Sequence, residues 1–428
     1  MRTYINPPET EWRELIKRPQ LELDFLDGAV RNILHRVRKS GDDALRELTL
    51  QFDKVALTEL MINDDEVNAA SAMLPDSLKD AMKVAALNIE SFHAQQRRES
   101  NTVETMPGVQ CWRKAVPIER VGIYIPGGTA PLFSTVLMLG IPARLAGCRE
   151  IILTTPPNSN GSVHPAILFA AQLVGITKIV KVGGAQAIGA LAYGTQTIPA
   201  VYKIFGPGNQ FVTRAKQMVM EDGVAIDIPA GPSEVLVFAD ESANPTFVAA
   251  DLLSQAEHGE DSQVMLVASR EDIIRAIQKE IDRLLPTLPR KEFAQKALIH
   301  SRAVTFDRLD KALRFINAYA PEHLIINRRD ATDLADQINN AGSVFLGNYS
   351  PEAVGDYASG TNHTLPTNGY ARTYAGISLE SYLKYITFQR ITEEGLRRIG
   401  PIVNELASAE ALEGHRLAVE VRLRELTT

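Results

Sequence analysis

RVGIYIPGG (residues 120–128) is a short β-branched run that closes on proline and glycine, and a stretch with helical spacing follows it. Four later segments have the same texture: EIILTTPPN (150–158), KIVKVGGA (178–185), VYKIFGPGN (201–209) and VAIDIPAGPSE (224–234). Short strands that alternate with helices are typical of βαβ units, which build a parallel sheet. We therefore predict a Rossmann-like domain over residues 123–233.

A second set of buried-strand patterns suggests another α/β layer system. It comprises EVLVFAD (234–240) with a helix over 245–258, then QVMLVAS (263–269), HLIIN (323–327) and SVFLG (343–347). Most of the first 110 residues have helical spacing, as does the chain beyond about residue 373, where we identify no strand. The predicted organisation is an N-terminal arm (1–20), a first Rossmann-like domain (21–122 and 234–372), the second domain (123–233) and a C-terminal helical arm (373–428).

Composition narrows the function. The 428 residues have a net charge of −7 with scattered Lys and Arg, which argues against nucleic acid as a partner. The N-terminus has no apolar signal region and no stretch of 18 apolar residues occurs, so we expect neither export nor a membrane span. Cys111 and Cys148 form no CxxC pair, which fits a reducing cytoplasm.

Glycine-rich loops at 127–128, 183–184 and 206–209 follow predicted strands of the second domain. Ligands gather at the carboxyl ends of the strands in an open parallel sheet, and backbone amides there can approach a pyrophosphate. None of these loops is a GxGxxG motif, and tight turns also use glycine without a ligand. The loops alone leave both interpretations open.

Polar residues at loops and helix ends form a possible metal site. Gln255 and His258 share one helical face in LLSQAEHGEDS (252–262), Asp356 lies in the polar loop GDYASGTNHTLPT (355–367), and His415 follows Gly414. Nitrogen and oxygen ligands of this kind suit zinc, although glutamine is an unusual ligand. A pair like Gln255 and His258 is more often a helix cap or a hydrogen-bonded core group, and spacing alone favours that explanation.

Glu322 and His323 stand at the start of the apolar strand HLIIN, just after Pro321. A neutral imidazole is a natural base for an alcohol proton, and a neighbouring carboxylate can activate water. The alternative is a surface glutamate beside a partly buried histidine.

Several long motifs, which occur in a fixed order along the chain, resemble those of a known family. The chain closely resembles the histidinol dehydrogenase family from about residue 25 to 425 in RVGIYIPGGTAPLFSTVLMLGIPARLAGC, KVGGAQAIGALAYGT, KIFGPGNQFVTRAK, DIPAGPSEVLVFAD, DLLSQAEHG, YAPEHLII, GSVFLGNYSPEAVGDYASGTNHTLPT and AEALEGHRLAVEVR.

The resemblance implies an NAD-linked, zinc-dependent oxidation of L-histidinol through a bound aldehyde to L-histidine, the last steps of histidine synthesis. It also implies an intertwined homodimer in which the C-terminal arm completes the partner's site. The family's zinc ligands match Gln255, His258, Asp356 and His415. The bound zinc would hold the substrate through its imidazole and amino nitrogens, mainly to orient it, and its four ligands would also contact the substrate.

The remaining roles also follow from the matching motifs. Glu322 would activate the water that hydrates the aldehyde, and His323, which also contacts substrate, would act as the base in both oxidations. Further substrate contacts match Ser233, His363 and Glu410, although Glu413 lies closer to His415 in the sequence. The family's NAD contacts match Tyr124, Gln186 and Asn209.

Two other functions remain open at this stage. A zinc hydrolase could use the same ligands with Glu322 as base, but it would leave the three NAD-matching loops without a role. A related dehydrogenase could act on another small alcohol. Neither Cys111 nor Cys148 matches a catalytic position of the family, so we expect a hydrate route rather than a cysteine thiohemiacetal.

Overall fold

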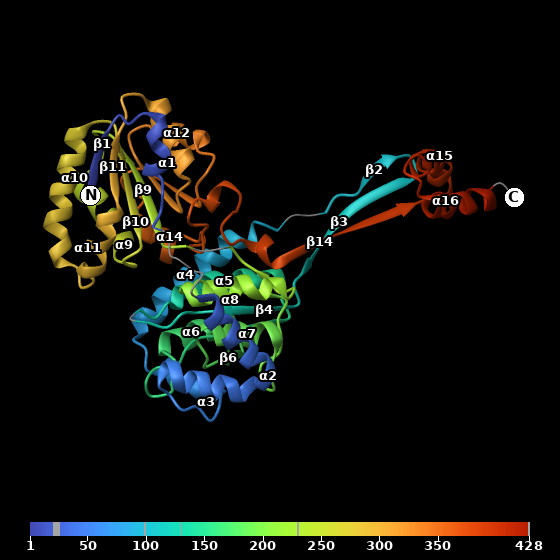
Figure 1. Cartoon of the computed structure of the whole chain (residues 1–428), viewed down its shortest axis with the longest axis horizontal. Helices are drawn as coiled ribbons and strands as arrows, with labels where there is room; N and C mark the ends of the chain where they lie inside the picture. The colour runs from blue at the N-terminus through green and yellow to red at the C-terminus, as the bar shows by residue number, and fades with distance from the viewer. Residues whose placement is uncertain (20–25, 98–99, 129, 229–230, 427–428) are drawn as a thin grey trace.

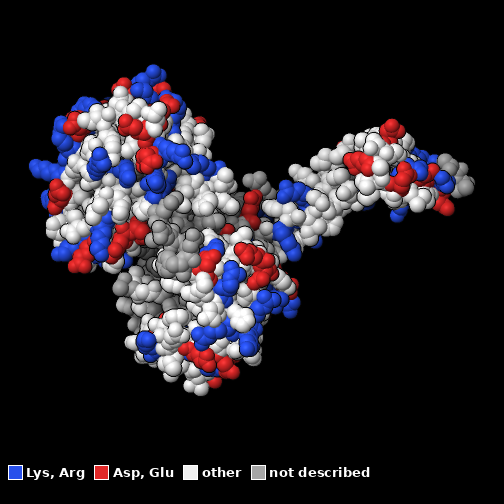
Figure 2. Space-filling model, in the orientation of Figure 1, with Lys and Arg blue, Asp and Glu red and all other residues white. Residues whose placement is uncertain are grey.

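The computed structural model describes residues 1–19, 26–97, 100–128, 130–228 and 231–426. It consists of two α/β lobes and an arm that projects from them to the C-terminal end of the chain (Figure 1). The predicted boundary between residues 20 and 21 lies outside the described residues. Lys and Arg are interspersed with Asp and Glu on the face shown in Figure 2. Within the described ranges, no helix has the length and apolar character needed to cross a membrane.

The first lobe is built on a parallel sheet with the order β1-β11-β10-β9-β12-β13. Its strands are β1 (Arg2–Ile5), β9 (Glu234–Ala239), β10 (Gln263–Ala268), β11 (Arg302–Thr305), β12 (His323–Asn327) and β13 (Ser343–Leu346). All side chains of β9, β10 and β12 are buried, because helices cover both faces of the sheet. Beyond β1, the other five strands have the order of the first five strands of a Rossmann fold.

Two hydrophobic clusters hold the helices of the first lobe to the sheet. On one face lie α9 (Pro245–Ala256), α10 (Glu271–Leu284) and α11 (Lys291–His300). On the other lie α1 (Glu9–Leu15), α12 (Leu309–Tyr319) and α13 (Ala331–Leu334). The short helix α14 (Glu352–Tyr357) follows β13, and the 3₁₀ turns of this lobe are η1 (Leu285–Thr287), η2 (Ala335–Gln337) and η3 (Tyr370–Arg372).

The second lobe repeats the same strand order in a five-stranded parallel sheet, β6-β5-β4-β7-β8. The strands are β4 (Arg120–Tyr124), β5 (Glu150–Thr154), β6 (Lys178–Val180), β7 (Lys203–Phe205) and β8 (Ala225–Ile226). One face is covered by α4 (Asp76–Ala94), α5 (Phe133–Ala146) and α6 (Pro165–Val174), with α3 (Asp64–Ala72) against α6. The other is covered by α2 (Leu26–Asp53), α7 (Gly184–Tyr193) and α8 (Gln210–Glu221). The prediction of two Rossmann-like domains is confirmed.

Three parts of the predicted organisation are corrected by the structure. Helices α2, α3 and α4 pack on the second sheet, although the sequence assignment placed residues 21–122 in the first domain. The first residues of the expected N-terminal arm form β1, which pairs with β11 at an edge of the first sheet. The chain beyond residue 373 contains the strand β14 (Leu383–Ile391), where only helix was expected.

The arm combines two distant parts of the sequence. Strand β3 (Val109–Pro117) pairs antiparallel with β2 (Val103–Met106) and with β14, which begins directly after η4 (Leu379–Tyr382). Helices α15 (Glu393–Ala409) and α16 (Glu413–Glu425) pack on each other at the end of the arm (Figure 1).

Candidate active site

Four of the predicted site residues meet at the amino-terminal edge of the first sheet. His323 is the first residue of β12, which pairs with β9 in a register that sets His323 beside Val235. A helix that leads into a parallel strand ends near that strand's amino end, so α9 delivers Gln255 in its last turn. The short helix α14 adds Asp356. Gln255, 67 positions before Glu322, and Asp356, 33 positions after His323, thereby reach one place.

His323 has a polar neighbour at each ring nitrogen, although its buried Nε2 makes no hydrogen bond to the described residues. Its Nδ1 lies 3.2 Å from the backbone oxygen of Glu234 and 3.7 Å from Oε2 of Glu322. Its Nε2 lies 3.4 Å from Oδ1 of Asp356. Gln255 donates from Nε2 to Glu322 Oε2 over 3.4 Å, so the four side chains form one connected group.

Burial and mutual charge shift the titration of this group. Burial raises the pKa of Glu322 to about 8, because water no longer solvates its charge. Burial disfavours the charged ring of His323, but the nearby carboxylates of Glu352, Glu322 and Asp356 outweigh it and raise the pKa of His323 to about 10. Glu352, which the sequence analysis did not single out, is 1% exposed, and its burial raises its pKa well above the usual value.

Gln255 Oε1 is buried and accepts no hydrogen bond from the described residues. A buried amide oxygen without a donor is costly, so this atom calls for a ligand. The Asp356 carboxylate belongs to the same group, and His258 lies exposed just beyond the end of α9. An amide oxygen, a carboxylate and an imidazole are a donor set that fits a divalent cation such as zinc.

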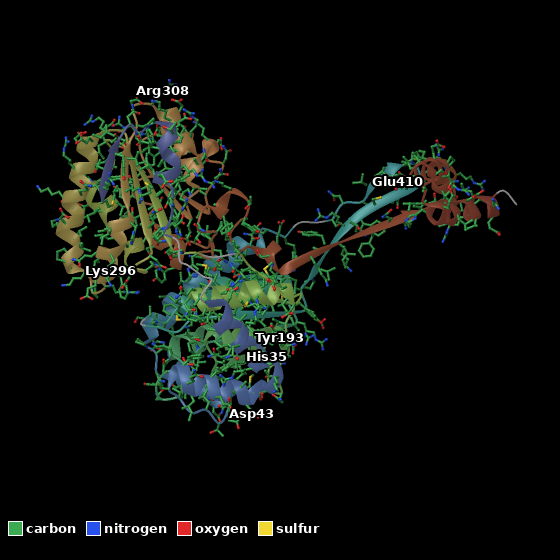
Figure 3. All side chains as sticks on the ribbon, viewed as in Figure 1. His35, Asp43, Tyr193, Lys296, Arg308 and Glu410 are labelled. Atoms are coloured by element: carbon green, nitrogen blue, oxygen red, sulfur yellow. The ribbon has the colours of Figure 1, made fainter. Side chains whose placement is uncertain are left out.

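Two predicted residues of this site lie elsewhere in the chain. Glu410 and His415 are exposed and belong to the arm, and Figure 3 shows Glu410 far from both lobes. Across the described ranges of the single chain, no group of three or more His, Cys, Asp or Glu residues could hold a metal ion. One chain therefore does not bring the four proposed zinc ligands together.

The other two predicted substrate residues lie closer to the group. Ser233 directly precedes β9, next to Glu234. His363 is bonded through Nδ1 to the Asp356 backbone oxygen at 2.8 Å, and its Nε2 lies 3.1 Å from the Thr135 hydroxyl of α5. Burial lowers the pKa of His363, which favours the neutral ring. This histidine thus joins the first lobe's site to the second lobe.

Tyr124, Gln186 and Asn209, the three residues predicted to contact NAD, line one cavity of about 780 Å³ in the second lobe. The cavity lies at the carboxyl ends of β4 and β7, between which the strand order reverses, and this is where such sheets bind ligands. Two predicted glycine loops, at 127–128 and 184, also line it. Burial raises the pKa of Tyr124 to about 12, so its hydroxyl keeps its proton and accepts from the Gly184 amide at 3.2 Å.

Several residues around the sites were missed by sequence reasoning. Asp53 and Phe52, at the end of α2, line the cavity of the second lobe. Glu234 supports the Glu322–His323 pair through its backbone and forms a buried ion pair with Arg18. A charged residue at the start of an otherwise apolar, fully buried strand was a visible signal for Glu234, whereas nothing in the sequence marks Arg18.

Fold and site together define a two-lobed α/β enzyme class, with a buried carboxylate–imidazole group in one lobe and a glycine-lined cavity in the other. The sequence pattern of the family described as "Histidinol dehydrogenase" matches residues 16–423. The chain belongs to the histidinol dehydrogenase family.

Individual relatives agree over nearly the whole length. A histidinol dehydrogenase of Bacteroides thetaiotaomicron is 56% identical over 426 residues, which cover 100% of both chains. One from Escherichia coli (strain K12) is 50% identical over 97% of this chain and 95% of its own. The crystal structure of histidinol dehydrogenase from Elizabethkingia anophelis superposes with a TM-score of 0.98 at 55% identity, covering 100% of this chain and 99% of that one.

Proposed function

We propose that this enzyme oxidises L-histidinol through bound L-histidinal to L-histidine with two molecules of NAD⁺. Family membership supports the substrate and the oxidoreductase class. The observation that carries the proposal is the convergence of Gln255, Glu322, His323 and Asp356 from separate elements on one buried point. This is an acid–base group beside a set of metal donors, as two successive oxidations of an alcohol require.

Gln255, His258 and Asp356 would hold zinc, with His415 supplied by the arm of a second chain. The bound ion would orient the substrate's imidazole and amino nitrogens. Ser233, His363 and Glu410 are proposed to contact the substrate, and the bond of His363 to the Asp356 backbone supports that position for one of them. The unpartnered Gln255 Oε1 supports the metal site.

Tyr124, Gln186 and Asn209 would hold NAD⁺, which accepts a hydride in each oxidation. Their shared cavity of about 780 Å³ is large enough for a cofactor-sized ligand. The side chain of Asn209 already accepts from the Val212 amide at 3.1 Å as the N-cap of α8, which leaves its NH₂ group for the ligand.

The residues of the first lobe account for both oxidations. His323 takes the hydroxyl proton of the alcohol as the carbon loses a hydride, which gives the aldehyde. Glu322 takes a proton from water as the water oxygen adds to the aldehyde carbon, and protonated His323 returns its proton to the former aldehyde oxygen, which gives the hydrate and a neutral ring. His323 then takes a proton from the hydrate as a second hydride leaves, and the carboxylic acid results. The base must be neutral at the start, and a cation at Asp356 would offset one of the carboxylates that favour the charged ring.

A cysteine route has less support. Both cysteines are free thiols, and burial raises the pKa of Cys148 to about 12, which disfavours the nucleophilic thiolate. Cys111 lies on strand β3 of the arm rather than in either lobe. The hydrate route uses only residues that already meet at the site.

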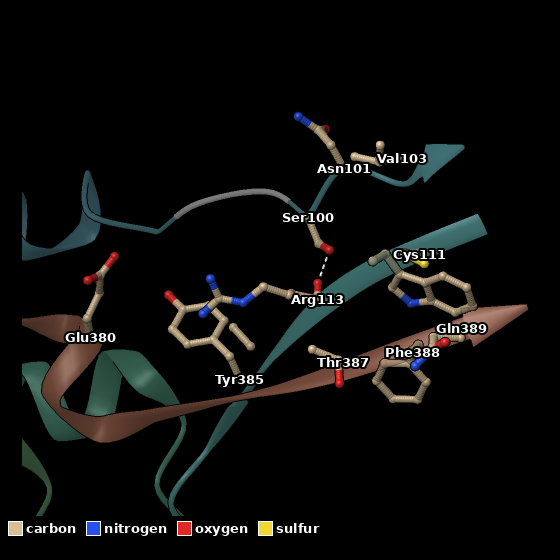
Figure 4. A pocket seen from close by; sticks show the side chains of 12 residues that line it. Ser100, Asn101, Val103, Cys111, Arg113, Glu380, Tyr385, Thr387, Phe388 and Gln389 are labelled. Atoms are coloured by element: carbon tan, nitrogen blue, oxygen red, sulfur yellow. Dashed lines mark hydrogen bonds between the residues drawn. The ribbon is translucent and has the colours of Figure 1, made fainter. Parts of the chain in front are cut away.

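We also propose the intertwined homodimer. The arm exposes large apolar side chains that a single chain leaves in contact with water, among them Ile386, Ile391, Ile402, Leu406, Leu412, Leu417 and Val421. Its sheet carries a hollow of about 760 Å³, where Figure 4 shows Arg113 beside Tyr385 and Phe388 nearby. Such a surface fits a second copy that also delivers His415. The cytoplasmic location stays a prediction.

The test is to supply L-histidinol and NAD⁺ to the purified enzyme. We expect two reduced cofactors and one L-histidine per substrate consumed, measured by absorbance and chromatography. One reduced cofactor and a released aldehyde would favour the alternative, a related dehydrogenase of another small alcohol. Hydrolysis without any reduced cofactor would favour the zinc hydrolase, which leaves the cavity of the second lobe without a role.

A further inference from the structure

Arg18 lies three residues beyond the end of α1 and reaches the strand next to the catalytic pair. Its guanidinium donates from Nε to Glu234 Oε1 at 3.0 Å and from Nη2 to Glu234 Oε2 at 2.8 Å. The exposed fractions of the two side chains are 6% and 1%. The guanidinium also lies 3.7 Å from the centre of the Tyr319 ring. The two hydrogen bonds and the stacking on the Tyr319 ring fix the orientation of the planar Arg18 guanidinium.

The same guanidinium holds the turn that leads into the catalytic pair. It donates to the backbone oxygens of Tyr319 at 2.7 Å and Ala320 at 3.4 Å. Ala320 has φ of 53°, a left-handed conformation that costs a non-glycine residue free energy. Two residues after this strained turn comes Glu322, so the bonds from Arg18 stabilise the conformation that aims it.

The backbone of Glu234 completes the connection. Its amide donates to Glu322 Oε2 at 2.8 Å, and its oxygen lies 3.2 Å from His323 Nδ1. With the proton on Nδ1, this bond leaves Nε2 as the basic nitrogen. Arg18 therefore fixes the residue that orients both members of the pair, and it fixes the turn before them.

We propose that Arg18 is a positioning residue for the Glu322–His323 pair, acting through the carboxylate of Glu234 and the turn at Ala320. The inference rests on the proposed roles of Glu322 and His323. Stability alone is a weak reason for the ion pair, because buried ion pairs can often be replaced by apolar groups without loss of stability. Lysine has no fork and could not make the same set of bonds.

The chain offers a control with the same bonding pattern, though more exposed at 11% and 37%, at the opposite end of β12. Arg328 follows the strand and makes the same kind of two-bond pair, from Nε to Asp330 Oδ1 at 2.8 Å and from Nη2 to Oδ2 at 2.9 Å. It also lies over an aromatic ring, that of Phe238, at 4.6 Å. Arg18→Met/Glu234→Gln and Arg328→Met/Asp330→Asn each remove one pair without leaving a lone buried charge.

We expect Arg18→Met/Glu234→Gln to lower kcat about tenfold to a hundredfold, a part of what a positioned acid–base group contributes. The KM for L-histidinol and the zinc content should stay within about twofold of the parent, since the metal donors are unchanged. The control variant should keep kcat within about twofold, as expected for a change remote from the chemistry. Arg18→Lys, which keeps the charge and is the safer variant to fold, should lose an intermediate part of kcat.

An equal fall of kcat in both double variants would overturn the inference, as would loss of zinc together with kcat, or wild-type kcat in Arg18→Lys. His323→Asn is assayed beside them to separate the two levels of the argument. If His323→Asn remains active, the proposed function of the pair is wrong. If it is inactive and Arg18→Met/Glu234→Gln matches the control, only the positioning role is wrong.

Discussion

At the scale of single residues, the proposed role of His323 depends on the atoms that surround its ring. One ring nitrogen faces a backbone oxygen at 3.2 Å and the other faces a carboxylate at 3.4 Å. A histidine on a surface loop has neither constraint. The bond at Nδ1 orients the ring, which the proposed role of His323 as the base in both oxidations would need.

His323→Asn should lower kcat by about 10² to 10⁴, the usual contribution of a positioned acid–base group. Asparagine keeps polarity but cannot take a proton. Zinc content, measured by elemental analysis, should be unchanged, because His323 is not one of the proposed ligands. A variant with normal turnover, or one that loses its metal, would contradict the proposed role.

Glu322→Gln separates the two oxidations. Only the aldehyde step needs water activated, so we expect oxidation of supplied L-histidinal to fall more than oxidation of L-histidinol to the aldehyde. The amide can still accept from the Glu234 backbone, which limits disturbance of the fold. Single-turnover rates for each substrate check this, and a normal rate with L-histidinal would show that Glu322 does not activate the water.

At the scale of elements, the turn after β7 shapes the cavity of the second lobe. Gly206 has φ of 122°, and an added Cβ would collide with the backbone oxygen of Tyr124. Gly175 also has a positive φ, of 87°, but an added Cβ there meets no atom within 4 Å. The two positions separate backbone strain from collision.

Gly206→Ala should lower the free energy of unfolding by about 3 kcal/mol or more, since strain and collision act together. Gly175→Ala should cost about 1–2 kcal/mol from strain alone. Chemical denaturation measures both. Because the collision displaces Tyr124, NAD⁺ binding should weaken in the first variant and stay normal in the second. Equal effects of the two substitutions would mean that the backbone contact is unimportant.

The strands at the centre of each sheet could be predicted from the sequence, because short apolar runs that end at glycine or proline are typical of buried strands. Strand β1 could not, since its four residues are mostly exposed at a sheet edge. The prediction that α2 belongs to the first domain was also wrong. Its apolar face shows that the helix is covered, but amphipathic spacing says nothing about which sheet covers it.

The residues of the site also fall into those that could be predicted from the sequence and those that could not. Gln255, Glu322, His323 and Asp356 were matched by family motifs, and the structure brings them together. Spacing alone could not have joined them, because their meeting depends on the order of parallel strands. Arg18 is the extreme case: its partner Glu234 is 216 positions away, and no local pattern connects the two.

At the scale of the whole molecule, the arm extends away from the lobes and ends in α16, the helix that contains His415 (Figure 1). Within the described residues, a single chain with this shape leaves the proposed zinc ligands apart and exposes large apolar side chains. The proposed dimer, in which each arm serves the partner's lobe, would cover that apolar surface and bring the fourth proposed ligand to the others.

Coexpression of a Gln255→Ala chain with a His415→Ala chain tests the shared site, because both lesions then meet in one site of a mixed dimer and the other site is intact. With random pairing, half of the dimers are mixed and half of their sites are whole, so activity should return to about one quarter of the wild-type value. Each parent alone should be inactive. If each chain built its own site, every site would carry one lesion. Verified mixed dimers that are no more active than the parents would therefore rule out the exchange of arms.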